Sequence, residues 1–154
     1  MRSIIIALAS AGYVGYIPVA SGTFGSAVAI PLFWGLHHLL SSSPVACVLV
    51  LVGAVVAACW IAGQAEGLFD EHDSSKIVID EVVGFLAATL FIAPTWPNTI
   101  AAFFIFRALD VIKPFPAGYI DKNLEGGAGV VLDDVVSGLY SNVILQILLL
   151  AHIL

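Results

Sequence analysis

Acidic and basic residues are absent from three long stretches of this chain. No Asp, Glu, Lys or Arg occurs from Ser3 to Ala65, from Val82 to Phe106 or from Val135 to Leu154. Only 10% of the residues are charged and 60% are hydrophobic, whereas soluble domains average about 25% charged residues. Uncharged apolar stretches of this length are typical of helices that cross a bilayer. We therefore predict an integral membrane protein.

The length and the cysteines indicate one membrane domain without cross-links. A chain of 154 residues is within the size of a single domain, so we predict one domain over residues 1–154. Cys47 and Cys59 both lie in the apolar run from Val45 to Ile61. In such surroundings a cysteine usually behaves as a small buried apolar side chain, so we expect neither a disulfide nor a metal ligand there.

Short turn-forming segments divide the apolar stretches into predicted helices. Ser41–Pro44 separates residues 24–40 from residues 45–65, and Pro94–Asn98 separates residues 77–93 from residues 99–113. The pattern predicts an all-α polytopic membrane protein of about five crossings, built from helical hairpins. The crossings are expected to begin near Phe24, Val45, Ile77, Thr99 and Asp134. Residues 4–16 are short and contain two glycines, so we expect a short interfacial or re-entrant helix there.

A turn at Pro94–Asn98 has a geometric consequence for the charged residues. The chain would cross after Glu81 and return before Arg107, so the charged clusters at 66–81 and 107–134 would meet on one side of the bilayer. Four of the five basic residues fall in these clusters, and the turns on the opposite side contain no Lys or Arg. Because cytoplasmic loops are enriched in these residues, we expect the charged side to face the cytoplasm.

The acidic pairs are candidate metal ligands. Asp80–Glu81 opens one predicted crossing and Asp133–Asp134 opens another. Acids in the first turn of a helix also interact favourably with its dipole, so one residue of the Asp80–Glu81 pair could simply cap its helix. Glu66 is a further candidate ligand, because it shares one helical face with Asp70 and Asp73 if that helix continues so far. A solvated helix end is the alternative for this last group.

Arg107, Asp110 and Lys113 are spaced i, i+3 and i+6, and we take them as candidate catalytic residues. The Arg fork and the Lys point charge both suit phosphate oxygens, with Asp110 orienting a cation or holding metal. The alternative is that the two bases only extend to the interface from the end of a helix.

Three further residues are candidates for binding the substrate. Thr23 and Ser26 offer hydroxyl groups near the positive end of a predicted helix, and the alternative is that their segment only caps this helix. Gly127 belongs to Gly126–Gly129, which we expect to be a glycine-rich loop whose amides approach a phosphate. Of the four histidines only His72 lies near the acids, so a histidine nucleophile has little support.

Four blocks of residues, in this order, resemble a known family. The blocks are Gly15–Pro18 with Gly22–Ser26; Ile77–Glu81 with Gly84; Phe106–Arg107 with Asp110 and Lys113–Pro116; and Gly126–Gly127 with Gly129, Leu132–Asp134 and Gly138. From about Gly12 to Gly138, the chain resembles the bacterial phosphatidylglycerophosphatase A family. Ser21 and Ser74 depart from the family pattern, which has proline at both loop positions.

The resemblance implies a multi-pass enzyme of the bacterial inner membrane. Such an enzyme removes the terminal phosphate of phosphatidylglycerophosphate, gives phosphatidylglycerol, and uses Mg2+ as cofactor; no nucleic-acid partner is implied. We hypothesise that Asp80, Glu81, Asp133 and Asp134 hold Mg2+ while Arg107 and Lys113 neutralise the phosphate. Either water or an aspartate could be the nucleophile.

Other classes of protein remain as alternatives. A membrane cation transporter or channel subunit could use the same carboxylates, although transporters place their ion sites near the middle of the bilayer and the acids here flank the predicted crossings. The paired aspartate signature of CDP-alcohol phosphotransferases is absent, as are the Lys, Arg and His blocks of histidine-dependent lipid phosphatases.

Overall fold

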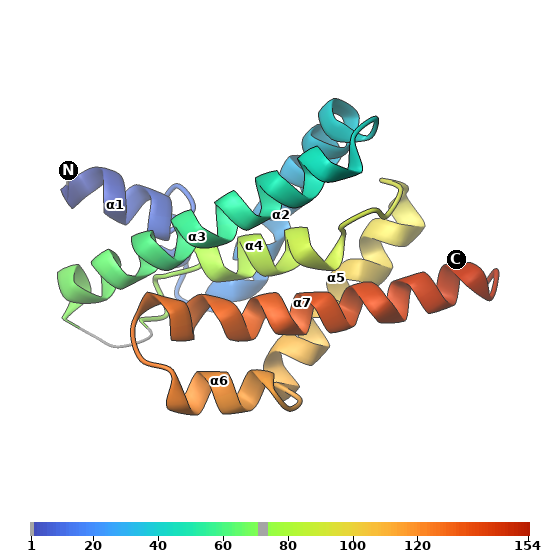
Figure 1. Cartoon of the computed structure of the whole chain (residues 1–154). Helices are drawn as coiled ribbons and strands as arrows, with labels where there is room; N and C mark the ends of the chain where they lie inside the picture. Colours follow the sequence, from blue (N-terminus) through green and yellow to red (C-terminus); the bar gives the residue numbers. More distant parts are fainter. Residues whose placement is uncertain (1, 71–73) are drawn as a thin grey trace.

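The protein is all-helical, as its sequence predicts. We describe a computed structural model that covers residues 2–70 and 74–154, and these residues contain seven α-helices and one short 3-10 helix (Figure 1). The helices are α1 (Arg2–Ala9), η1 (Val14–Tyr16), α2 (Ser21–Leu40), α3 (Pro44–Phe69), α4 (Ile79–Ala88), α5 (Trp96–Ile112), α6 (Ala117–Asn123) and α7 (Gly127–Leu150).

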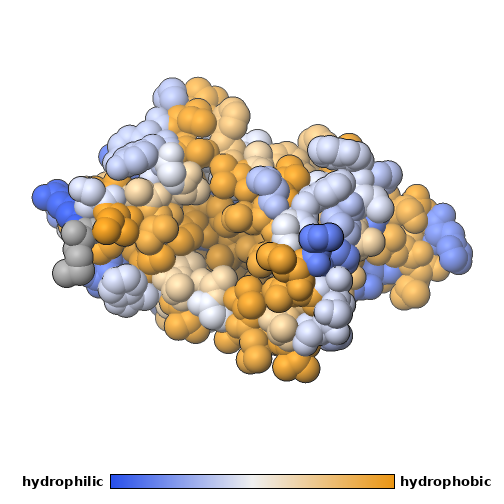
Figure 2. Space-filling view, turned by 90° about the horizontal axis from the view of Figure 1, so that it is seen from above, coloured by the Kyte–Doolittle hydropathy of each residue, from blue (hydrophilic) through white to orange (hydrophobic). Residues whose placement is uncertain are grey.

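Three helices of the described chain, α2, α3 and α7, are long and apolar enough to cross a membrane. Only 17% of the most apolar stretch of α3 is buried, against 50% of that of α7. Large apolar side chains such as Leu49, Val56 and Trp60 are consequently exposed on α3. Apolar residues dominate the middle of the face seen in Figure 2, and hydrophilic residues lie mainly toward its ends. This distribution suits contact with lipid.

The predicted turns are present. Ser43 caps α3 by accepting a hydrogen bond from the Ala46 amide, and Pro44 is the first residue of that helix. Thr95 caps α5 in the same way through the Asn98 amide. At the N-terminus, α1 has eight residues, about 12 Å of helix at 1.5 Å per residue, which is too short to span a bilayer.

Helix α4 is shorter than the crossing expected over residues 77–93. It ends at Ala88, and its ten residues extend about 15 Å. The Thr89 hydroxyl donates back to the Phe85 carbonyl, and the Asn142 side chain of α7 donates to the carbonyls of Ala88 and Leu90. These bonds satisfy backbone groups that a helix end would otherwise leave unpaired. The sequence pattern of α4 alone does not reveal this partner.

Helix α7 lies at the centre of the fold, in contact with α3, α4, α5 and α6 (Figure 1). It begins at Gly127, so Asp133 and Asp134 lie inside the helix rather than at its start. The expectation that Gly126–Gly129 forms a loop is therefore wrong beyond Gly126, whose φ is 73°. The glycines instead permit close packing, because a Cβ on Gly127 would lie 2.0 Å from the Cys59 carbonyl oxygen of α3.

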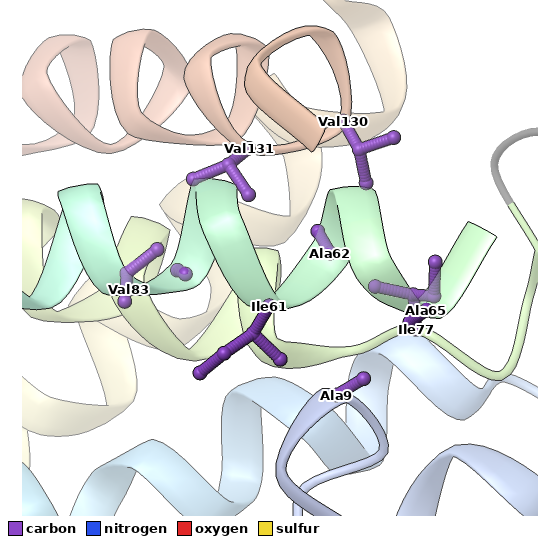
Figure 3. Close-up of a cluster of buried hydrophobic side chains, with 9 residues drawn as sticks. Ala9, Ile61, Ala62, Ala65, Ile77, Val83, Val130 and Val131 are labelled. Carbon is purple, nitrogen blue, oxygen red and sulfur yellow. The ribbon is translucent and has the colours of Figure 1, made fainter. Parts of the chain in front are cut away.

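Two apolar clusters support the site. One joins α1, α3, α4 and α7; Figure 3 shows that Ile61 and Ala62 of α3 lie between Ala9 of α1 and Val130–Val131 of α7. The other is built around Phe85 of α4 and Phe106 of α5, whose ring centroids are 6.2 Å apart. Together they fix α4, α5 and α7 relative to one another, and these helices carry most of the charged residues described below.

Candidate active site

A polar cavity of about 810 Å3 gathers most of the sequence-predicted site residues. It lies among the start of α2, the segment before α4, and helices α4 to α7. The predicted residues that line it are Asp80, Glu81, Arg107, Asp110, Lys113, Asp133 and Asp134. The hairpin between α4 and α5 thus brings the two charged clusters together, as predicted from the turn at Pro94–Asn98.

Three carboxylates form a compact group at this cavity. One oxygen each of Asp80, Glu81 and Asp134 lies within 4.8 Å of the other two. Asp80 and Asp134 are buried, with 7% and 3% of their surface exposed, and Glu81 is half-buried. Asp80 and Glu81 come from the first turn of α4, and Asp134 comes from the second turn of α7. The close contact of α4 with α7 therefore creates the group.

This group fits a divalent cation. Within the described chain, Asp80 Oδ1, Glu81 Oε2, Asp133 Oδ1 and Asp134 Oδ2 are buried and have no hydrogen-bond partner. Buried carboxylates without a partner repel one another and are costly. A hard divalent ion, which prefers carboxylate oxygens, would offset the charge of the group formed by Asp80, Glu81 and Asp134. The acidic cluster of Asp80, Glu81 and Asp134 could therefore bind a metal ion.

Arg107 and Asp110 form an ion pair beside this group. Arg107 Nη1 donates to Asp110 Oδ2 over 2.5 Å, with one helical turn of α5 between the residues. Gly22 of α2 lies against the same side chains: a Cβ there would be 2.1 Å from Glu81 Oε1 and 3.1 Å from Arg107 Nη2. The start of α2 thus forms a wall that holds Glu81 and Arg107 close together.

Lys113 joins three helices. It ends α5 in the left-handed conformation, with φ 47°, and its Nζ donates to Asp121 Oδ1 of α6 over 2.6 Å and to Asp133 Oδ2 of α7 over 2.5 Å. Burial lowers the pKa of Lys113, but the two carboxylates outweigh burial and raise this pKa above its ordinary value. The cavity therefore contains a fixed cation at neutral pH.

Sequence reasoning missed two charged residues that line the cavity, Asp121 and Lys76. Asp121 is in α6, eight residues from its partner Lys113, so helical spacing gave no signal. Lys76 precedes α4, and its Nζ lies 5.2 Å from the centre of the Phe69 ring. The sequence signal for Lys76 is its position between the acidic residues at 66–73 and those at 80–81.

Other predicted residues lie away from the cavity lining. Glu66 borders a separate hollow of about 680 Å3 together with Asp70. Helix α3 ends at Phe69, and Asp70 adopts a left-handed conformation, so Asp70 already lies beyond the helix that carries Glu66. Asp73 and His72 lie outside the described residues.

The three candidate substrate-binding residues also lie outside the lining. Ser26 is fully buried and its hydroxyl donates to the Gly22 carbonyl within α2. Gly127 packs on α3, as described above. Thr23 is half-buried in the first turn of α2, and the cavity lining there consists of its neighbours Ser21 and Gly22.

An all-helical chain with long apolar helices, buried acids and adjacent cations has the make-up of a membrane-embedded enzyme acting on an anionic substrate. The sequence pattern of the family Phosphatidylglycerophosphatase A matches residues 7–149. The chain belongs to this family of phosphomonoesterases. Membership favours the enzyme over the transporter alternative.

Three curated proteins are similar to this chain over most of its length. Phosphatidylglycerophosphatase A of Escherichia coli is 37% identical over 82% of this chain and 73% of its own length. The enzyme of the same name from Haemophilus influenzae is 34% identical over 84% and 79%. A Bacteroides thetaiotaomicron protein with the provisional name phosphatidylinositol-3-phosphatase is 34% identical over 86% of both chains. No solved structure matches the chain.

Proposed function

We propose that this protein is a Mg2+-dependent phosphatase that hydrolyses phosphatidylglycerophosphate to phosphatidylglycerol and inorganic phosphate. The observation that carries the proposal is the group of three carboxylates, two buried and one half-buried, in one cavity with Arg107 and Lys113. Family membership supports the lipid substrate, because two relatives are named for this reaction.

In the proposed mechanism, Asp80, Glu81 and Asp134 would hold the ion, and Asp133 lines the same cavity. A bound divalent ion would supply charge neutralisation at the phosphate and lower the pKa of water. Arg107 offers a planar fork to two phosphate oxygens while Asp110 fixes its orientation. Lys113, at the end of the same helix, contributes a second positive charge to the cavity.

The balance of the reaction is simple. A water oxygen bonds to phosphorus, the bond from phosphorus to the glycerol oxygen breaks, and a proton ends on that oxygen. Negative charge spreads over the phosphoryl oxygens in the transition state, and Arg107 and Lys113 stabilise it there. Burial of the site strengthens these contacts because the surroundings screen charge poorly.

For topology, we propose five crossings, α2, α3, α4 with its following turn, α5 and α7, with α1 at the interface. The cavity then opens to the cytoplasm of a bacterial inner membrane. Three of the chain's five basic residues, Lys76, Arg107 and Lys113, line this cavity, and the turns at residues 41–43 and 89–95 contain neither Lys nor Arg. This bias supports a cytoplasmic site.

The test is phosphate release by purified protein in detergent micelles, with and without Mg2+. We expect release from phosphatidylglycerophosphate that stops on chelation and returns when Mg2+ is added. Activity that survives exhaustive chelation would contradict the metal assignment. Phosphate release from phosphatidylinositol 3-phosphate but not from phosphatidylglycerophosphate would contradict the proposed substrate. Glu125→Gln serves as the control variant, because Glu125 lies outside the cavity lining.

A further inference from the structure

Two carboxylates from different helices hold the Lys113 ammonium group. An ammonium group has three N–H donors, and Asp121 and Asp133 accept two of those of Lys113. We infer that Asp121 is a positioning residue, which fixes the Lys113 side chain so that its third donor is available to a phosphate oxygen in the cavity. This inference rests on the proposed function.

Helix α6 is anchored to Lys113 at two points. A Cβ on Gly118 would lie 2.7 Å from the Lys113 carbonyl oxygen, so the first turn of α6 packs directly on the backbone of Lys113. Asp121 follows three residues later on the same face of α6 and reaches the Lys113 side chain. The position of Asp121 is therefore set by the backbone on which its partner sits.

A lysine side chain needs such an anchor. Its four-carbon stem has many rotamers, and a single carboxylate leaves the ammonium group free to pivot. Asp133 holds Lys113 from α7, and Asp121 holds it from α6, so the two bonds together define where the nitrogen lies. Displacement of a substrate-contacting charge by about 1 Å can cost 100-fold in rate.

Asp121 is also separate from the candidate metal group. Its side chain is 32% exposed, whereas that of Asp133 is 3% exposed. The three clustered carboxylates are Asp80, Glu81 and Asp134. Loss of Asp121 should therefore loosen Lys113 without removing a ligand from that group.

The first experiment measures the contact without any activity. Lysines of the detergent-solubilised protein are acetylated, and the rate at each position is followed by mass spectrometry. We expect Asp121→Ala to raise the labelling rate of Lys113 about tenfold, because the opening of charged contacts exposes the nitrogen. The exposed Lys122 of α6 is the internal control and should label equally in both proteins. An unchanged Lys113 rate would overturn the inference.

The second experiment is a double-mutant cycle on phosphate release. Asp121→Ala should lower kcat by about 10- to 100-fold in the wild-type background but less than about twofold in Lys113→Met, because the residue acts through that lysine. Asp121→Asn, which keeps an acceptor oxygen, should fall between wild type and Asp121→Ala, and Glu125→Gln should match wild type. Equal costs in both backgrounds would overturn the inference.

The two experiments separate the inference from the function on which it rests. If the wild-type protein releases no phosphate from phosphatidylglycerophosphate, the proposed function fails, while the labelling rates still decide whether Asp121 holds Lys113. If Asp121→Ala does not fold, Asp121→Asn gives both readouts at nearly unchanged side-chain volume.

Discussion

Gly138 of α7 lies directly against Gly84 of α4: a Cβ on Gly138 would be 2.2 Å from the Gly84 carbonyl oxygen. A Cβ on Gly84 would in turn be 2.9 Å from the Asp134 carbonyl oxygen. The two helices therefore cross with their backbones in contact, as small residues allow in membrane proteins. This crossing brings Asp134 to Asp80 and Glu81.

We expect Gly138→Ala to destabilise the protein by about 3 kcal/mol, because backbone atoms must move to admit the methyl group. Gly35→Ala is the matched control, since a Cβ there meets nothing within 4 Å. It should be neutral or stabilising by up to about 1 kcal/mol through helix propensity. Thermal unfolding in micelles measures the stability of both variants. Equal unfolding temperatures of Gly138→Ala and Gly35→Ala would mean that the crossing of α4 and α7 tolerates a Cβ.

Gly22→Ala should lower activity much more than stability. The added Cβ would meet the flexible end of Glu81 at 2.1 Å rather than backbone, so the carboxylate can turn aside at small cost to folding. Because Glu81 would then leave the carboxylate group, we expect a loss of about 100-fold in kcat/KM. The measurement pairs phosphate release with the unfolding temperature. A wild-type rate of phosphate release by Gly22→Ala would show that the Glu81 carboxylate keeps its position beside the added methyl group.

Asp80→Asn, Glu81→Gln and Asp134→Asn should each reduce phosphate release by orders of magnitude. In the absence of divalent ions the same changes should not lower the unfolding temperature, because each relieves repulsion among buried carboxylates. Added Mg2+ should raise the unfolding temperature of wild type more than that of any variant. An equal rise in all four proteins would contradict the assignment of these ligands.

Lys113→Met should lose about 2 to 4 kcal/mol of transition-state stabilisation, which corresponds to roughly 30- to 1,000-fold in rate. Lys113→Arg should also be impaired, since a planar fork cannot reproduce the contacts of one nitrogen with Asp121 and Asp133. Rates are compared at matched helix content, measured by circular dichroism. Full activity of Lys113→Met would remove this residue from the mechanism.

The topology can be tested by labelling after Cys47 and Cys59 have been replaced. Cysteines introduced at Ser42, Ser75 and Lys122 all lie at exposed positions. In intact cells we expect an impermeant thiol reagent to reach Ser42→Cys only, because the other two lie on the side of the cavity. Reaction at both Ser75→Cys and Ser42→Cys would contradict the proposed orientation.

Much of the fold was predictable because turn chemistry is local. The Ser–Pro and Thr–Trp–Pro segments cap α3 and α5 as their residues suggest. A turn between α4 and α5 returns the chain to the side from which it came, so Asp80, Glu81 and Arg107 were predicted to meet there. The pairing of Arg107 with Asp110 was also within reach, because it depends on spacing along one helix.

The remainder depends on contacts between helices, which spacing does not encode. The early end of α4 depends on Asn142 of another helix. The local sequence Gly126–Gly129 predicts a loop. The helix α7 nevertheless begins at Gly127, whose backbone packs closely against α3. The partnership of Lys113 with Asp121 needs the turn between α5 and α6, and no periodic pattern predicts it.

The central position of α7 constrains when the enzyme can mature. This helix is synthesised after every helix it contacts, so α3, α4 and α5 are complete before their common neighbour exists. Until then Asp80 and Glu81 lack Asp134, and Lys113 lacks Asp133. A nascent chain therefore lacks the complete group of carboxylates and the second anchor of Lys113 until α7 has been made and has packed against the earlier helices.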